Sequence, residues 1–465
     1  MSSGIVEKQL GSILSDIDRG PSNQEKAVPG FVSSLLAIAQ GQLACVAVAA
    51  LTQLCIARLL GPSLQGLISL SLMSVAFGAL IGSLGSEATI IVWVSKSKGS
   101  LSSWFPAVMF WVVSGCLLSS TLWALLYWKW HPSFLKGLTP GLAFWVLSAI
   151  PVAVLFSVVM ALLVGEERFR LRSLIALVNR IAALVVFLIS FALFGHRAET
   201  AVVGYLAGLA VAICIALAFL RHFVLDAWKL KEARQSLLPT MKFGTRAQAG
   251  NMVTFFSYRF DVFIVNYFLD ASQVGLYALG VLVSEALWQL PAVVATALCP
   301  RTARTVGTGA DRFTCMIVRQ VFILTMLAGL AIAFASPFAI PFIFGARFAP
   351  SVPVIWWILP GTIVFSLGKV IGADLTGREM NSHMVISSFV GFVFTLLLDL
   401  FLIPRMGIQG AALASSIAYF AGGGYLLVVI KRELKTPWRS LLLPSLADLT
   451  AYVRLWQQFR ARFWP

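Results

Sequence analysis

The chain has 465 residues, of which 59% are hydrophobic and only 12% charged, and its mean hydropathy is +0.89. This composition excludes a soluble globular protein and indicates a multi-span membrane protein, with gaps between apolar segments too short for a folded extramembrane domain. The net charge of +16 does not indicate a nucleic-acid partner, because the basic residues are dispersed over many short loops.

Twelve segments are apolar and long enough to cross a bilayer, which takes roughly 20 residues. In chain order the expected spans are 31–58, 64–86, 103–128, 140–164, 171–194, 200–221, 242–269, 273–298, 314–340, 351–372, 383–403 and 408–430. Pro106, Pro151, Pro291 and Pro360 are expected inside spans, where membrane helices tolerate kinks. The sequence therefore predicts an all-α membrane protein with an N-terminal tail (1–30), two six-helix bundles (31–224 and 242–430), a linker between them (225–241) and an amphipathic tail (431–465).

Lysine and arginine indicate the orientation. The connections on one side of the expected spans, together with both tails, carry a roughly fourfold excess of basic residues over the connections on the other side. Both termini and the linker are therefore expected in the cytoplasm. The tail from Lys435 to Pro465 interleaves aromatic and arginine residues, which favours a helix lying on the anionic inner leaflet.

The expected seventh and eighth spans carry the deepest polar residues. Each ionised group at the centre of a membrane helix costs about 2.5 to 3.5 kcal/mol, so such groups face a partner or a water-filled lumen. At helical spacing the polar and small residues of the seventh span form two stripes, Arg246, Gly250, Thr254, Ser257 and Asp261 on one and Gln248, Asn251, Arg259 and Asn266 on the other. The eighth span adds Glu285 and Gln289. These two spans are expected to line a polar interior.

An internal repeat supports the two-bundle architecture. The stretch from Leu60 to Leu70 after the first span aligns without a gap to the stretch from Leu269 to Leu279 after the seventh, with Gly66 opposite Gly275. Six is an even number of spans, so the two bundles would share one orientation and be related by an axis along the membrane normal.

Three stretches occur in the order typical of one transporter family. They are Ala57-Arg58-Leu59-Leu60-Gly61-Pro62 with Gly66, Tyr258-Arg259-Phe260-Asp261 leading to Val274-Gly275-Leu276-Tyr277-Ala278, and Pro404-Arg405-Met406-Gly407-Ile408-Gln409-Gly410-Ala411-Ala412. Over about residues 30–430 the chain resembles the polysaccharide flippases, which export lipid-linked O-antigen and exopolysaccharide units and belong to the multidrug/oligosaccharidyl-lipid/polysaccharide (MOP) superfamily.

The resemblance implies a V-shaped, MATE-like pair of bundles that alternates between inward-open and outward-open forms. It implies transport of undecaprenyl-pyrophosphate-linked oligosaccharide across the bacterial inner membrane for polysaccharide biosynthesis, with no enzymatic step and no cofactor. The lipid substrate, membrane lipid and a polysaccharide polymerase or export machinery are the implied partners. The lipid II branch typically carries several arginines in its first two spans, whereas the first span here has Gln40, Gln42 and Gln53.

A lumen for a sugar chain and a pyrophosphate needs amides, hydroxyls and arginines. The candidate substrate ligands are Gln40, Gln42, Asn179, Arg180, Arg246, Asn251, Arg259 and Lys369. Lys369 and Arg246 lie near span ends, where the alternative is a snorkelling side chain. Arg259 lies too deep to snorkel.

Two carboxylates are candidates for ion coupling. Asp261 and Glu285 could accept a coupling proton or sodium ion, and the alternative is a structural ion pair with Arg259. We find no Walker-type glycine loop, so uphill transport would draw on an ion gradient or on consumption of the flipped product. Asp399 and Glu87 lie near span ends and are expected to be exposed at the interface.

Three functional hypotheses remain. A lipid-linked oligosaccharide flippase fits best. A cation-coupled multidrug or metabolite antiporter of the same superfamily would need a compact acidic site in one bundle. A membrane polymerase or ligase would need a larger external loop than the sequence offers. The six cysteines have no metal-ligand spacing, and no metal site is expected.

Overall fold

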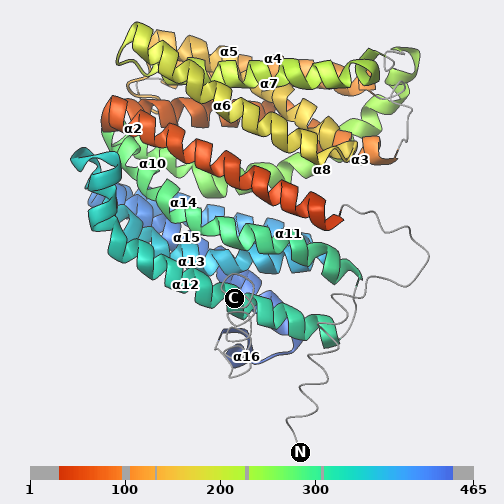
Figure 1. The fold of residues 1–465 in the computed structure, drawn as a ribbon, viewed down its shortest axis with the longest axis vertical. Coiled ribbons are helices and arrows are strands. Elements are labelled where there is room, and N and C mark those ends of the chain that lie inside the picture. Colours follow the sequence, from red (N-terminus) through yellow and green to blue (C-terminus); the bar gives the residue numbers. More distant parts are fainter. Residues whose placement is uncertain (1–30, 97–104, 131–132, 226–229, 305–307, 443–465) are drawn as a thin grey trace, which may run out of the picture.

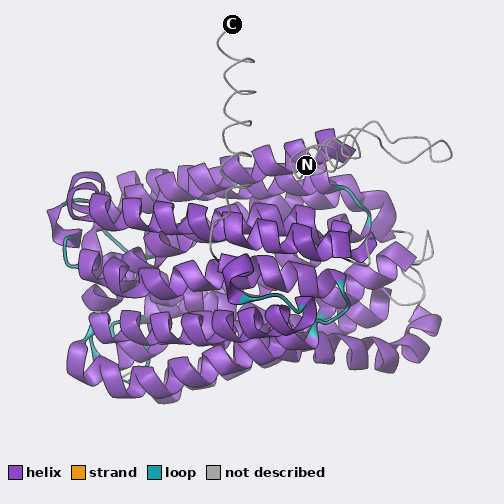
Figure 2. Ribbon diagram, turned by 90° about the horizontal axis from the view of Figure 1, so that it is seen from below, coloured by secondary structure: helices purple, strands orange, loops and turns teal. Residues whose placement is uncertain are grey.

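The computed structural model describes residues 31–96, 105–130, 133–225, 230–304 and 308–442, and within these ranges the side chains of 31–43, 221–225 and 230–240, among others, are left undescribed. Every regular element in this part of the chain is helical, and the helices run roughly parallel with their connections at two ends (Figure 2). They are α2 (Phe31–Ser83), α3 (Ser86–Lys96), α4 (Phe105–Trp130), α5 (Pro140–Gly165), α6 (Phe169–Phe194), α7 (Glu199–Leu225), α8 (Leu230–Arg259), α9 (Asp261–Phe268), α10 (Ala271–Glu285), α11 (Gln289–Arg304), α12 (Thr308–Phe344), α13 (Ser351–Gly377), α14 (Ser382–Met406), α15 (Ile408–Leu434) and α16 (Trp438–Leu442), with 3-10 turns η1 (Ala286–Trp288) and η2 (Ala346–Phe348).

Among the described residues, 10 helical segments are long and apolar enough to cross a membrane. The first two expected spans form one helix, α2, which bends at Gly61 (φ 75°, ψ 178°) just before Pro62. The seventh expected span is divided at Phe260 into α8 and α9, and α8 carries Arg246 and Arg259. The all-α membrane architecture is confirmed, and the lower number of candidate spans has these two local causes.

The prolines differ in part from expectation. Pro151 and Pro360 lie inside α5 and α13, as predicted. Pro106 is instead the second residue of α4, and Pro291 is the third residue of α11, directly after a 3-10 turn. A proline in the first turn of a helix has no hydrogen bond to lose, so neither needs to kink its helix.

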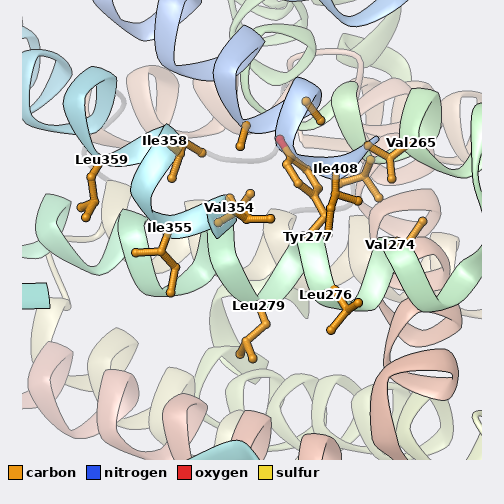
Figure 3. Packing of buried hydrophobic residues seen from close by; sticks show 14 of the residues in the cluster. Val265, Val274, Leu276, Tyr277, Leu279, Val354, Ile355, Ile358, Leu359 and Ile408 are labelled. Atoms are coloured by element: carbon orange, nitrogen blue, oxygen red, sulfur yellow. The ribbon is translucent and has the colours of Figure 1, made fainter. Parts of the chain in front are cut away.

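The helices form two groups. Figure 1 shows α4 to α7 along one side and α10 to α15 along the other, with α2 and α8 between them. Within the first group α6 packs on α7, and α5 packs on α2 and α7; within the second, α15 packs on both α13 and α14. In the second group, side chains of α10 interlock with Val354, Ile355 and Ile358 of α13 in a buried apolar cluster (Figure 3).

Large apolar side chains cover the outer surface. Phe334, Phe338 and Phe342 follow one face of α12 and are about four-fifths exposed, as is Trp128 on α4. An apolar surface of this kind would aggregate in water but suits hydrocarbon. These faces are where the protein contacts lipid.

The repeat glycines meet at the first of two contacts between the groups. A Cβ added at Gly66 of α2 would overlap the carbonyl oxygen of Ala271, and one at Gly275 of α10 would overlap that of Pro62. Only glycine permits such close packing of two helices. At the same end Arg58 donates from Nε to the carbonyl oxygen of Ile343 (2.6 Å), in the last turn of α12, which joins the groups again.

The second contact lies at the opposite end of α2. Gln248 of α8 donates to Ser83 Oγ (3.2 Å) and to the carbonyl oxygen of Leu80. A Cβ added at Gly85 would overlap the backbone of Gly244. Through α2, the first group therefore contacts α10 near one end of α2 and α8 near the other.

Candidate functional site

The deepest charged residues sit at two interruptions of the helices. Arg259 ends α8 and Asp261 begins α9, while Glu285 ends α10 just before η1. The backbone keeps helical dihedrals at both places (Phe260 φ −72°, ψ −26°; Glu285 φ −69°, ψ −15°), so each is a local irregularity along a continuous helical path, and we call it a break. At the first break, Asp261 Oδ1 accepts from the backbone N–H of Val262 (2.8 Å). The eight residues of α9 place this break about 12 Å from the end of the helix.

Arg259 and Glu285 form a two-pronged ion pair between the breaks. Arg259 Nη2 donates to Glu285 Oε2 (2.7 Å) and Nη1 to Oε1 (3.2 Å). The carboxylate also accepts from Tyr419 Oη (3.3 Å). The Glu285 side chain is 12% exposed but that of Arg259 is 34% exposed. The guanidinium is therefore oriented by the pair, and the Arg259 side chain as a whole remains partly exposed.

Four aromatic rings pack beside this pair. The rings of Tyr258, Trp288, Phe365 and Tyr419 have centroids 5.2 to 5.9 Å apart in all pairs, and we call them the aromatic cluster. Lys369 Nζ lies 4.4 Å from the centroid of Trp288 and 5.6 Å from that of Phe365, within the range of a cation–π interaction. Lys369 thus packs over rings beside the ion pair instead of snorkelling freely. Two cations, Arg259 and Lys369, thus lie near the carboxylate of Glu285, and Asp261 also interacts electrostatically with Arg259.

Asp261 belongs to a second, separate hydrogen-bond group. Its Oδ2 accepts from Tyr277 Oη and from Ser415 Oγ (3.4 Å), and those two hydroxyls are 3.0 Å apart. Figure 3 shows Tyr277 rising from α10 toward the neighbouring helix. Asp399 on α14 interacts electrostatically with Asp261 and Tyr277. Its side chain is fully buried, and neither of its oxygens has a hydrogen-bond partner in the described part of the structure.

The burial of Asp399 corrects an expectation. A carboxylate near a span end was expected to be exposed, but α14 continues to Met406, so Asp399 lies inside the helix against α9 and α15. Burial of an unpartnered carboxylate is costly, which makes this residue a functional candidate that sequence position alone did not reveal. The sequence analysis also missed Tyr277, Trp288 and Tyr419. Aromatic residues are common in apolar helices, so their presence does not indicate a site.

The other sequence-predicted residues whose side chains the structure describes are not part of this site. Arg246 and Asn251 are exposed on α8, and Asn179 and Arg180 lie on α6 in the first group. Gln40 and Gln42 lie in α2, where side chains are outside the described part of the structure. The polar stripe of α8 faces α14 at two points, where Thr254 bonds Ser388 (3.1 Å) and Ser257 packs on Gly391, so this part of it is a helix interface.

A family model described as polysaccharide biosynthesis protein matches residues 55–353. The lipid II flippase MurJ of Bacillus subtilis (strain 168) is 34% identical over 89 residues, which are 19% of this chain and only 16% of that protein. Among solved structures, a lipid II flippase MurJ in an inward closed conformation has a TM-score of 0.71 at 16% identity, covering 91% of this chain and 93% of that one. A MATE transporter, VcmN of Vibrio cholerae, has a TM-score of 0.58 at 15% identity, covering 88% and 97%.

The fold defines a multi-pass membrane protein with the architecture of the MOP exporters. Because the family model covers more than half of its length, the chain belongs to the polysaccharide biosynthesis protein family. The family expected from the three sequence stretches is confirmed. One of those stretches, Tyr258-Arg259-Phe260-Asp261, contains the α8–α9 break itself.

Proposed function

We propose that the protein is a flippase for undecaprenyl-pyrophosphate-linked oligosaccharide repeat units in the bacterial inner membrane, without an enzymatic step. The observation that carries this is the partly exposed, two-pronged Arg259 with Lys369 beside it, in the middle of a membrane protein. A planar guanidinium binds phosphate through two parallel hydrogen bonds, and in a low-dielectric site this interaction is strong. The aromatic cluster would stack on sugar rings of the cargo.

Transport would proceed by alternating access between two bundles, residues 31–224 and 242–430. The contacts at Gly66–Gly275 and at Gly85–Gly244 are the two closures that such a cycle would open in turn. Residues 225–241 and 431–465 would then be the cytoplasmic linker and tail, and Gln40, Gln42, Asn179, Arg180, Arg246 and Asn251 would meet the head group in an open state.

An oligosaccharide is favoured over lipid II as the cargo. The lipid II branch is typically rich in arginine in its first two spans, but α2 contains one arginine, Arg58, and that side chain is occupied by carbonyl oxygens at the end of α12. The membrane of a bacterial strain that lacks the protein tests the proposal. Undecaprenyl-pyrophosphate-linked repeat units should accumulate in the inner leaflet; unchanged repeat units with accumulated lipid II would contradict it.

The topology gives a separate prediction. If the basic connections face the cytoplasm, reporter fusions at Ile430 will be active only as cytoplasmic reporters, and cysteines placed between Arg221 and Lys242 will be protected from impermeant thiol reagents in intact cells. Cysteines in the connection that holds Arg197 should be labelled. An external reporter at Ile430 would reverse the proposed orientation.

We also propose that Asp261, with Asp399 as its neighbour, holds a coupling cation. During transport Arg259 would exchange its partner between Glu285, Asp261 and the substrate phosphate. Asp399 is buried without a hydrogen-bond donor among the described residues, and a bound cation would stabilise its carboxylate. The substrate phosphate would compete with Glu285 for the guanidinium of Arg259. Asp261→Asn and Asp399→Asn should therefore abolish the response of transport to an imposed proton or sodium gradient while Glu285→Gln weakens it. Thermal unfolding in detergent checks that the variants fold. A gradient response equal to the parent's in both aspartate variants would rule out this site.

The same observation favours a second candidate. Asp261 and Asp399 interact electrostatically and lie on α9 and α14, and a cation-coupled antiporter of the superfamily would need acidic groups near each other within one bundle. An antiporter would move small drugs or metabolites against the gradient without any lipid-linked substrate. Gradient-driven efflux of such compounds from vesicles, with no effect of added undecaprenyl pyrophosphate, would favour it over the flippase.

A further inference from the structure

A large apolar cavity lies between the two helix groups, apart from the polar site. Its volume is about 430 Å³, within the usual range of ligand pockets. It is lined by α2 and α4 on one side and by α8 and α9 on the other, and its walls are mainly aromatic and aliphatic side chains such as Phe77, Trp123, Phe256 and Phe263. No part of the cargo's head group, with its hydroxyls and phosphates, suits these walls.

The two serines in the wall do not change this chemistry. Ser74 Oγ donates to the carbonyl oxygen of Leu70 (2.8 Å), and Ser119 Oγ donates to that of Cys116 (3.2 Å). Each hydroxyl thus donates its hydrogen bond to a backbone carbonyl of its own helix. Because its walls are almost entirely apolar, a hydrocarbon chain from the bilayer suits this cavity better than water does.

The cavity is open to the side that faces lipid. Leu122 and Trp130 both line it and are 45% and 47% exposed, and they belong to the apolar outer face of α4. A chain can therefore enter from the bilayer without crossing water. Lipid tails are as apolar as the cavity walls, so the hydrophobic effect contributes little to binding of a hydrocarbon chain in the cavity. The favourable term is van der Waals contact between the chain and the walls.

The cavity also adjoins the candidate site along the chain. Phe260, which lines it, is the single residue between Arg259 and Asp261 at the α8–α9 break. An anion bound at Arg259 would lie deep in the membrane, whereas the phosphate of an ordinary phospholipid lies at the surface. A molecule that occupies both places carries a phosphate joined directly to a long hydrocarbon chain.

We propose that this cavity binds the first isoprene units of the polyprenyl carrier while its pyrophosphate is held at Arg259. The inference rests on the proposed function and adds a subsite to it. The cavity tethers the carrier, which raises the effective concentration of pyrophosphate at the guanidinium. The carrier chain thus stays in the apolar cavity while the head group crosses between the bundles.

Photocrosslinking tests the subsite directly. A benzophenone amino acid replaces Leu122 in the full-length protein, and in the control it replaces Leu118, which is equally exposed on α4 but does not line the cavity. Both proteins are placed in phosphatidylethanolamine–phosphatidylglycerol vesicles that contain a small fraction of undecaprenyl pyrophosphate. Because tethering concentrates the carrier, the ratio of polyprenyl to phospholipid adducts should be at least about tenfold higher at position 122 than at 118.

Two further measurements complete the test. Leu126→Trp, which fills the cavity, should lower the adduct ratio at position 122 and slow transport several-fold, whereas Leu125→Trp on the outer face of α4 should change neither. Equal ratios at positions 122 and 118 would show an acyl-chain crevice and overturn the inference. Native mass spectrometry of the parent protein separates the two claims. If the parent binds undecaprenyl pyrophosphate but the ratios are equal, only the subsite is wrong; if it binds none, the proposed function fails too.

Discussion

Exchanging Arg259 and Glu285 should abolish transport even though the ion pair is kept. In the double variant Arg259→Glu, Glu285→Arg the two side chains can still form a two-pronged pair across the breaks of α8–α9 and α10–η1. The guanidinium, however, would project from α10 and no longer face the position where the substrate phosphate binds. A structural ion pair would tolerate the exchange; a phosphate ligand would not. The measurement is polymer export together with protein level.

Other variants at the same two residues test the claim further. Arg259→Lys keeps the charge but loses the planar fork, so partial export is expected. Arg259→Ala leaves Glu285 buried without its partner, which costs about 3 to 5 kcal/mol and can lower the protein level by itself. Arg259→Gln combined with Glu285→Gln removes both charges, so it should restore the protein level without restoring export. Normal export from this neutral pair would show that neither charge acts on the substrate.

Enlarging Gly66 or Gly275 should prevent closure of the end where the two repeats meet. The added Cβ atoms would overlap backbone carbonyl oxygens of Ala271 and Pro62, which cannot rotate away. Overpacking costs typically about 1 to 3 kcal/mol, and a shift of 3 kcal/mol changes the ratio of two conformations by about 150-fold. Gly275→Leu should therefore hold that end open and reduce transport by two orders of magnitude, on the order of that shift.

Thiol labelling distinguishes an open end from a misfolded protein. In a variant without native cysteines, a cysteine is placed at Asn251, an exposed position on α8, and an impermeant reagent should reach it from only one side of the membrane when Gly275 is leucine. Gly424→Leu is the matched control, because a Cβ there meets nothing within 4 Å. Labelling unchanged by Gly275→Leu would mean that this crossing is not a gate.

Sequence reasoning succeeded where periodicity and motif order carry the information. Long apolar runs predicted the membrane helices, and the Leu60–Leu70 and Leu269–Leu279 repeat singled out Gly66 and Gly275, which turn out to contact each other. Depth in a span singled out Arg259 and Glu285, which the structure joins. These features follow from the free-energy cost of a charge inside a membrane helix and from the close helix packing that glycine permits.

Sequence reasoning failed where the environment of a residue depends on which other helix packs against it. The charge of Asp399 is visible in the sequence, but its burial depends on the packing of α14 against α15 and α9. Thr254 and Ser257 form a polar stripe that suggests a lumen, and the structure shows that α14 covers it. The lining of the apolar cavity likewise comes from four helices that no short-range pattern relates.

The most direct test of the central claim is transport by the purified protein in liposomes. A fluorescent undecaprenyl-pyrophosphate-linked oligosaccharide is placed in one leaflet, and its arrival in the other is followed by a membrane-impermeant quencher. The parent protein should move it faster than protein-free liposomes do, and the Arg259–Glu285 exchange variant should not. Movement by the exchange variant at the parent's rate, or no movement by the parent, would contradict the account.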